Sequence, residues 1–264
     1  MINFLKRKVV TFGKKFLRLA IDYDEIDRMI QTNLSTMAMH RESFSQFKGV
    51  NEGKEVVVFA TGPSSKKYKP IPGCIHIGVN HAYLRADINF DYYFVQDYAI
   101  GRKHLEEINW YRQGRCVKFY GIVSTYKDKF GNSIIIPEGD AIKARAFRYR
   151  TDYSAFKPWQ CKFAFDISVQ PLGDFGSVVF SALQFALWTH PRRIYLVGCD
   201  CTYAGHFFAK ATQSMQNLKL GGYEEMVVAY KAFKQFAYDY YPDIEIVSIN
   251  PVGLRGLYND LTME

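Results

Sequence analysis

The feature that most constrains the fold is residues 55–65, where an apolar run leads directly into a tight turn. The run Glu55–Ala60 is short and rich in β-branched residues, which is typical of a strand buried on both faces of a parallel sheet. Gly62 and Pro63 then reverse the chain, so we expect the backbone amides and the Ser64 hydroxyl to face the space beyond the strand. Ligands of open α/β sheets bind at that edge, although a plain strand-to-helix turn would look the same.

The turn is not one of the common phosphate-binding fingerprints. Pro63 is incompatible with a glycine-rich dinucleotide loop, and the chain contains no G-x-x-x-x-G-K-[ST] segment.

Five further runs resemble strands, and helical patterns lie between several of them. These runs are Cys74–Val79, Asp91–Gln96, Cys116–Tyr120, Arg193–Gly198 and Ile244–Ile249. Strands that alternate with helices indicate an α/β fold, with a Rossmann-like, mostly parallel sheet and helices on both faces.

The chain divides into an N-terminal helical segment, residues 1–50, and a nucleotide-binding α/β domain, residues 51–264. The alternation of strands and helices is interrupted over about 122–172, which we interpret as a lid insertion over the carboxyl edge of the sheet. The basic and aromatic run Lys143–Arg150 lies within it, and a solvated face would explain that run equally well.

Charge favours an anionic partner. The net charge is +8, but no nucleic-acid-binding motif accompanies it, so we do not expect DNA or RNA. Residues 1–21 contain basic and apolar residues and no acidic one, which suits a helix on an anionic membrane. A helix packed on the body or at the interface of a homo-oligomer is the alternative.

The chain carries no secretory signal and no apolar run long enough to span a bilayer. We therefore expect a cytoplasmic protein, peripheral on the inner face of the membrane if residues 1–21 bind there. The five cysteines fit buried free thiols in a reducing compartment. Cys199 and Cys201 lack a second ligand pair, so we expect no metal site.

Polar side chains follow several of the predicted strands. Asn80 and Gln96 can read a base or a ribose through paired donors and acceptors. Asp97 could bind a ribose or a metal, or cap the chain end. Asp200 emerges at the carboxyl end of Arg193–Gly198, on the same rim.

Gly176 and Ser177 precede an apolar helix predicted over Val178–Trp188. Because this helix is apolar nearly all round, we expect it to be buried. Its N-terminus is either an anion site or a plain N-cap formed by Ser177.

Two residue types offer acid–base chemistry. His206 follows a glycine in the loop after Arg193–Gly198, and it could act as a general base or stabilise a departing phosphate. Glu224 and Glu225 begin a second, amphipathic helix. They suit the helix N-terminus electrostatically, or one of them is a catalytic carboxylate.

The order of these motifs resembles the bacterial sialyltransferases that build the termini of lipooligosaccharides and capsules. It equally resembles the related group called domain of unknown function 115, which includes a pterin diphosphokinase. The similarity consists of short motifs scattered over residues 54–255, namely Thr61–Ser64, Asn80, Gly176–Val178, Ile194–Asp200, Tyr203 and Asn250-Pro251.

The resemblance implies a glycosyltransferase that moves an acidic sugar from a CMP-activated donor to a surface glycan, with inversion and without a catalytic metal or other cofactor. It implies that Thr61, Gly62, Ser64 and Asn80 hold the nucleotide. Gly176 and Ser177 would lie near the cytidine or ribose, and the Tyr203 loop would face the donor phosphate.

The chain departs from the pattern at three places. Thr61 replaces an asparagine, Tyr203 is displaced by about one position, and the stretch Gly221–Glu225, where the family has its catalytic histidine, contains none. The base is therefore His206 or a glutamate such as Glu225, and a Kdo donor is as plausible as a sialic acid donor.

Two other functions remain open at this point. A diphosphokinase would use ATP and Mg²⁺, with Asp97, Asp174 and Asp200 as metal ligands. A non-catalytic nucleotide- or glycan-binding protein would use the same rim without chemistry.

Overall fold

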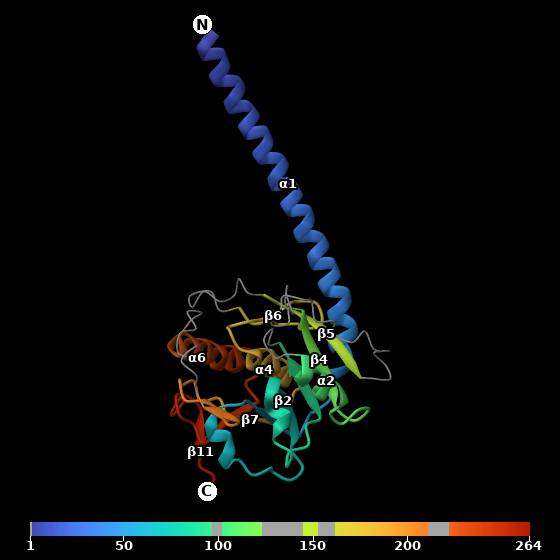
Figure 1. The fold of residues 1–264 in the computed structure, drawn as a ribbon, viewed down its shortest axis with the longest axis vertical. Coiled ribbons are helices and arrows are strands. Elements are labelled where there is room, and N and C mark those ends of the chain that lie inside the picture. Colours follow the sequence, from blue (N-terminus) through green and yellow to red (C-terminus); the bar gives the residue numbers. More distant parts are fainter. Residues whose placement is uncertain (1, 97–101, 123–144, 153–161, 211–221) are drawn as a thin grey trace.

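The computed structural model describes residues 2–96, 102–122, 145–152, 162–210 and 222–264, and the side chains of α1 from Tyr23 onward. Its centre is a sheet in the order β11-β10-β7-β1-β2-β3-β4-β5-β6, in which every pairing is parallel. Helices pack on both faces (Figure 1), so the predicted α/β, Rossmann-like class is confirmed.

All six strands expected from the sequence are present. The sheet strands are β1 Glu55–Phe59, β2 Ile75–Val79, β3 Tyr92–Val95, β4 Val117–Ile122, β5 Ala146–Asp152, β6 Leu172–Gly173, β7 Arg193–Val197, β10 Glu245–Ile249 and β11 Asn259–Leu261. The helices are α1 Ile2–Phe44, α2 Arg102–Trp110, α4 Val178–Trp188 and α6 Tyr223–Tyr240, with short 3-10 turns η1 Ser45–Phe47, η2 Pro63–Lys67 and η3 Asn80–Leu84.

Strand β1 shows how the sequence produces the three layers. Side chains alternate across a strand, so Val56 and Val58 enter one core while Val57 and Phe59 enter the other. The first core contains α4, α6 and the base of α1. The second contains residues of α2 and η3, together with Tyr68, which follows η2. A run that is apolar at every position is therefore required, and Val56–Phe59 supplies it.

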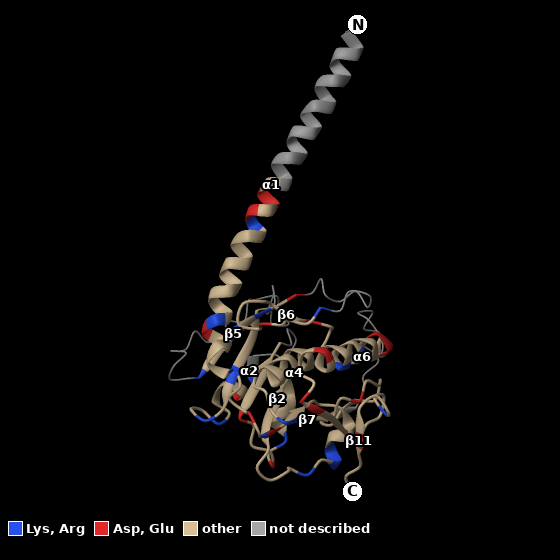
Figure 2. Ribbon diagram, turned by 180° about the vertical axis from the view of Figure 1, so that it is seen from behind, with Lys and Arg blue, Asp and Glu red and all other residues tan. Residues whose placement is uncertain are grey.

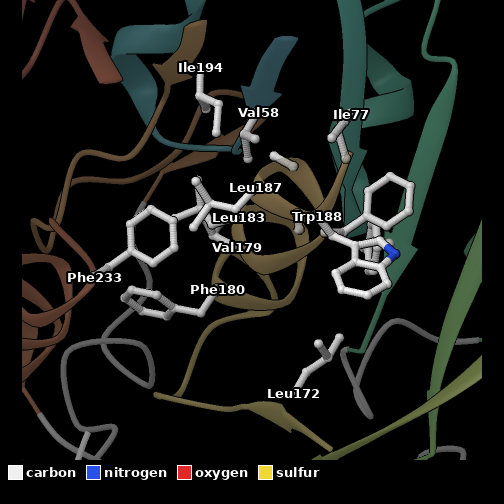
Figure 3. Close-up of a cluster of buried hydrophobic side chains, with 14 of the residues drawn as sticks. Val58, Ile77, Leu172, Val179, Phe180, Leu183, Leu187, Trp188, Ile194 and Phe233 are labelled. Atoms are coloured by element: carbon white, nitrogen blue, oxygen red, sulfur yellow. The ribbon is translucent and has the colours of Figure 1, made fainter. Parts of the chain in front are cut away.

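Helix α4 is the central element of the first core. All of its residues are buried, as its almost uniformly apolar sequence predicts. Figure 3 shows α4 between strand residues such as Val58 and Ile77 and the Phe233 ring of α6. Because α4 contacts β1, β2 and β3, its N-terminus is held at the carboxyl edge of the sheet.

Strand β1 is also where the order of the sheet reverses. The chain runs outward through β2, β3 and β4 on one side of β1, while β7, β10 and β11 lie on the other. In open α/β sheets, the carboxyl ends of the strands on either side of such a switch point form the binding crevice. The carboxyl ends of β1 and β7 are therefore where a ligand of such a sheet would be expected to bind.

Part of the predicted insertion belongs to the sheet. Residues 146–152 form β5, which pairs with β4 from Lys118↔Ala146 to Ile122↔Arg150, so the basic and aromatic run is largely a strand. Alternating arginines and aromatic residues suit a strand near the edge, and in β5 only Tyr149 is buried while the other residues are partly exposed. Residues 123–144 and 153–161 lie outside the described residues, so the lid stays a prediction.

Helix α1 is joined to the body through its last turns. His40 is fully buried, and its Nδ1–H donates to the Ile167 carbonyl at 2.8 Å. Its Nε2 accepts the Arg150 N–H of β5 at 2.8 Å, which requires the neutral ring. Burial lowers the pKa of His40 from 6.5 to about 4. None of the helices, over their described residues, has the length and apolar character needed to cross a membrane.

The buried His40 predicts a loss of stability in acid. The unfolded chain binds a proton near pH 6.5, whereas the folded chain does so only near pH 4. Stability from this group is therefore complete above pH 6.5 and falls by about 3 kcal/mol as pH drops to 4. Urea unfolding across this range should show a shallower decline for His40→Gln than for the wild-type chain. The exposed-site variant His190→Gln should keep the wild-type slope, and equal slopes for all three proteins would contradict the assignment.

Candidate functional site

The ends of β1 and β7 approach one another closely. The Gly62 N–H donates to the Gly198 carbonyl at 2.9 Å, one step beyond the sheet pairing. A Cβ at Gly62 would lie 2.4 Å from Gly198 O, and a Cβ at Gly198 would lie 2.4 Å from Ala60 O. Gly198 also has φ +68°, which disfavours other residues. Both positions therefore require glycine for the two loops to meet.

Asp200 joins these two loops. Its carboxylate accepts the Ser64 N–H at 2.8 Å and also the Ser64 hydroxyl. Asp200 is buried, so its charge needs such donors. The Ser64 amide and hydroxyl were expected to face a ligand, but they face Asp200 instead. Nucleotide binding by Ser64 stays a prediction, and the donors it would use already hold a carboxylate.

His206 also lies against the end of β1. Its Nδ1 is 2.9 Å from the Thr61 hydroxyl, and the Phe207 N–H donates to the Thr61 carbonyl at 2.8 Å. His206 belongs to a short hairpin of β8 Gly205–His206 and β9 Ala209–Lys210. These bonds place an imidazole at the switch point, in contact with the turn Thr61–Ser64 that follows β1.

A row of aromatic rings continues from His206 toward the end of β2. The Phe208 ring stacks on His206 with centroids 5.1 Å apart, and it lies 4.9 Å from His81. The His81 ring is in turn 4.7 Å from His104 of α2. The carboxyl edge therefore carries three imidazoles, from the ends of β2 and β7 and from α2.

His104 is linked to two further groups. The Tyr83 hydroxyl bonds to both His104 Nδ1 and Glu107, and the bond to Glu107 lowers the pKa of that carboxyl. Sequence analysis proposed neither His81 nor His104. His81 was detectable, because it follows Asn80 at the same strand end. His104 sits within a helix, and no local signal distinguishes it.

Gln96 and Asn80 form a buried network instead of facing open space. Asn80 Oδ1 accepts the Gln96 N–H at 3.1 Å. The Gln96 amide donates to Asp174, and its Oε1 accepts the Tyr149 hydroxyl at 3.0 Å and the Ser181 hydroxyl at 3.1 Å. These bonds join β3, β5 and α4. The expectation that Gln96 reads a base or ribose stays a prediction, and its Oε1 already has two donors.

Ser177 caps the N-terminus of α4, which was one of the two alternatives for this residue, and nucleotide binding there stays a prediction. The Ser177 Oγ accepts the Val179 N–H at 3.4 Å, and the Gly176 N–H donates to Asp174 at 2.9 Å. Gly176 is exposed and has φ +76°, which suits glycine. Ser177 is half-buried, and a serine hydroxyl that accepts one bond can still donate another. Asp97 lies outside the described residues.

Tyr203 lies between the β7 loop and α6. Its ring is 44% exposed and packs edge-on against Tyr223 with centroids 4.5 Å apart. Glu225 is half-buried in the first turn of α6, and its N–H donates to Gly222 O at 2.9 Å. The two residues thus belong to adjoining segments, while His206 is tied to the end of β1. His206 and Glu225 remain separate candidates for the base.

The described carboxylates do not form a metal site. Asp200 is engaged by Ser64, and Asp174 by Gln96 and Gly176. Among the residues that the structure describes, no group of three or more histidine, cysteine or acidic side chains has metal-binding geometry.

The described cysteines are free thiols. Cys116 is buried, whereas Cys74, Cys199 and Cys201 are half-buried, so burial was predicted correctly only for Cys116; Cys161 is not described. Burial raises the pKa of Cys116 and of Cys199 to about 12, which keeps both protonated at neutral pH.

A surface hollow of about 360 Å³ lies at the opposite edge of the sheet, where β1 and β7 begin. Trp188, His190 and Tyr241 line it, and the Lys48 ammonium lies 4.8 Å from the Trp188 ring centroid. Sites in parallel α/β sheets lie at the carboxyl edge, so we place the candidate site at the other end of these strands.

Comparison with known proteins gives one structural similarity to report. No protein family and no curated protein matches this chain. Among solved structures, the sialyltransferase CstII from Campylobacter jejuni, in complex with the substrate analogue CMP-3FNeuAc, is similar over 79% of this chain and 86% of its own, with 14% identity and a TM-score of 0.43.

Two glycine variants test the close approach of β1 and β7. Gly198→Ala and Gly256→Ala share the left-handed strain of about 1–2 kcal/mol, but only Gly198 has neighbours within 4 Å. Urea unfolding should therefore show a loss for Gly198→Ala about 1–3 kcal/mol greater than for Gly256→Ala. Equal losses of unfolding free energy in the two variants would contradict a close approach of β1 and β7 at Gly198.

Proposed function

We propose that the protein is a glycosyltransferase that moves an acidic sugar of sialic acid or Kdo type from a CMP-linked donor to a surface glycan, with inversion. The observation that carries this proposal is the pairing of Thr61 with His206 at the topological switch point. It puts an acid–base group where α/β enzymes bind nucleotides. The order of motifs described in the sequence analysis supports the CMP donor.

The Thr61 contact prepares His206 for proton transfer. When the ring Nδ1–H donates to the Thr61 hydroxyl oxygen, the lone pair lies on Nε2. Nε2 then removes the proton from the acceptor hydroxyl as that oxygen attacks the anomeric carbon and the bond to the CMP phosphate breaks. Stacking against Phe208 and the bond to Thr61 both restrict the rotation of the ring.

The donor phosphate needs groups that the protein has not already used. The Ser64 amide holds Asp200, so we place the phosphate toward Tyr203 and Ser177 instead. Tyr203 offers a half-exposed hydroxyl, and Ser177 stands at the N-terminus of α4, where the helix dipole favours negative charge. Asp200 then acts as a structural group that fixes the Ser64 turn.

The diphosphokinase alternative has less support from the described carboxylates. Mg²⁺ binding would require Asp174 and Asp200 to give up bonds to Gln96, Gly176 and Ser64. A binding screen separates the two functions. CMP should raise the melting temperature of the full chain without metal, whereas stabilisation by ATP and Mg²⁺ with no effect of CMP would overturn the glycosyltransferase proposal.

Replacing the proposed base should abolish turnover and preserve donor binding. His206→Ala is expected to lower kcat by about 10²–10⁴-fold, measured as CMP release from CMP-sialic acid and CMP-Kdo, with CMP affinity unchanged within about threefold. His190→Ala is the matched control, because His190 lies at the opposite edge of the sheet. If His206→Ala retains activity and Glu225→Gln loses it, the base is Glu225.

Thr61 is a positioning residue, and its removal should have a smaller effect. Thr61→Val keeps the shape of the side chain and removes the hydroxyl that contacts His206. We expect kcat to fall about tenfold, with KM for the donor unchanged, because one hydrogen bond of about 1.4 kcal/mol is lost. A higher KM with normal kcat would assign Thr61 to donor binding instead.

A further inference from the structure

The N-terminal helix is not covered by the body over residues 23–35. α1 is 43 residues long, and among its described side chains, from Tyr23 onward, only those from Thr36 onward include buried ones. Figures 1 and 2 show it leaving the body at the edge of the sheet. Every residue from 23 to 35 is exposed, including Tyr23 at 73%, Ile26 at 54% and Ile30 at 49%. Helices in water normally depend on packing of an apolar face, so this one needs a partner.

The spacing of the apolar residues identifies the kind of partner. Apolar residues recur at alternating intervals of three and four, as at the a and d positions of a heptad repeat. The a and d positions are Ile2, Leu5, Val9, Phe12, Phe16, Leu19, Tyr23, Ile26, Ile30, Asn33 and Met37.

The period of 3.5 residues distinguishes a coiled coil from a membrane-surface helix. A straight α-helix has 3.6 residues per turn, so a heptad seam drifts about 20° per repeat, or about 100° between residues 2 and 37. Such a seam turns away from a flat bilayer but stays in contact with a second helix that supercoils around it. We propose that α1 pairs with α1 of a second copy of this chain as a coiled coil.

Charge selects the antiparallel orientation. All charged side chains of residues 1–21 are basic, and acidic residues begin at Asp22. In a parallel pair, positions 22 and 27, both aspartate, would face each other across the seam. In an antiparallel pair, lysine and aspartate positions meet.

One antiparallel register satisfies both the seam and the charges. With Leu5 of one copy opposite Ile30 of the other, the inner layers pair position 9 with 26, 12 with 23 and 16 with 19, and all of these are apolar. Only the outermost layer, which pairs position 2 with 33, contains a polar residue, Asn33. The same register sets position 15, a lysine, near position 22, and position 6, a lysine, near position 27. The overlap of residues 2–33 is about 48 Å long and ends just before the body begins at Thr36.

Sedimentation of the full chain tests the pairing. At ~20 µM the wild-type chain should be a dimer, with twice the chain mass of 30.5 kDa. Ile26→Asp/Ile30→Asp, at two exposed seam positions, should weaken dimerisation at least about 100-fold. Gln31→Asp/Thr32→Asp adds the same charge off the seam and should change it less than about threefold. A monomeric wild-type chain, or a dimer unaffected by the seam variant, overturns the proposal.

Charge reversal tests the orientation. Asp22→Lys should weaken an antiparallel dimer about tenfold, and Lys15→Asp/Asp22→Lys should restore it. In a parallel dimer Asp22→Lys would instead strengthen pairing, by attracting Asp27 of the other copy, and that result overturns the antiparallel register.

Sedimentation with vesicles of phosphatidylcholine and phosphatidylserine tests whether α1 binds an anionic membrane instead. Vesicle binding by a chain that is monomeric in solution would assign α1 to the membrane and overturn the proposal.

Discussion

The parallel pairing of β1 with β7 is the contact on which the carboxyl edge of this protein depends. It brings together two chain segments that are far apart in sequence, and the glycines at 62 and 198 let them continue side by side beyond the strands. The Ser64–Asp200 and Thr61–His206 bonds both cross this junction. Without the glycines, side chains would hold the loops apart, and the polar groups would lose their partners.

The strands and the buried helix could be predicted because their residues carry the signal themselves. Glu55–Phe59 and Val178–Trp188 are apolar at nearly every position, which only elements covered on all sides can tolerate. β5 was missed, since alternating arginine and aromatic residues also describe an exposed loop. Strand ends were located correctly, but the sequence does not show which partner satisfies a polar group. Gln96 and Ser64 therefore turned out to bond within the protein.

His104 and the N-terminal helix show the same limit, because the sequence alone does not reveal which partner a residue meets in the folded protein. His104 approaches His81 only after α2 packs on the sheet, which no local pattern reveals. For α1, composition suggested a basic amphipathic helix. The spacing of its apolar residues is what favours a coiled coil over a membrane-surface helix. A period of 3.5 instead of 3.6 residues alters which residues align over several turns. The exposure of Ile26 and Ile30 then showed that the body of the protein leaves this seam uncovered.

The bond between Asp200 and the Ser64 turn has a consequence for inhibition. The carboxylate already accepts the amide and the hydroxyl of Ser64, the two donors that a sulfate or phosphate ion would use at this turn. Such an ion would have to displace a group that is covalently tethered beside the turn. A small inorganic anion should therefore be a weak competitor at this turn.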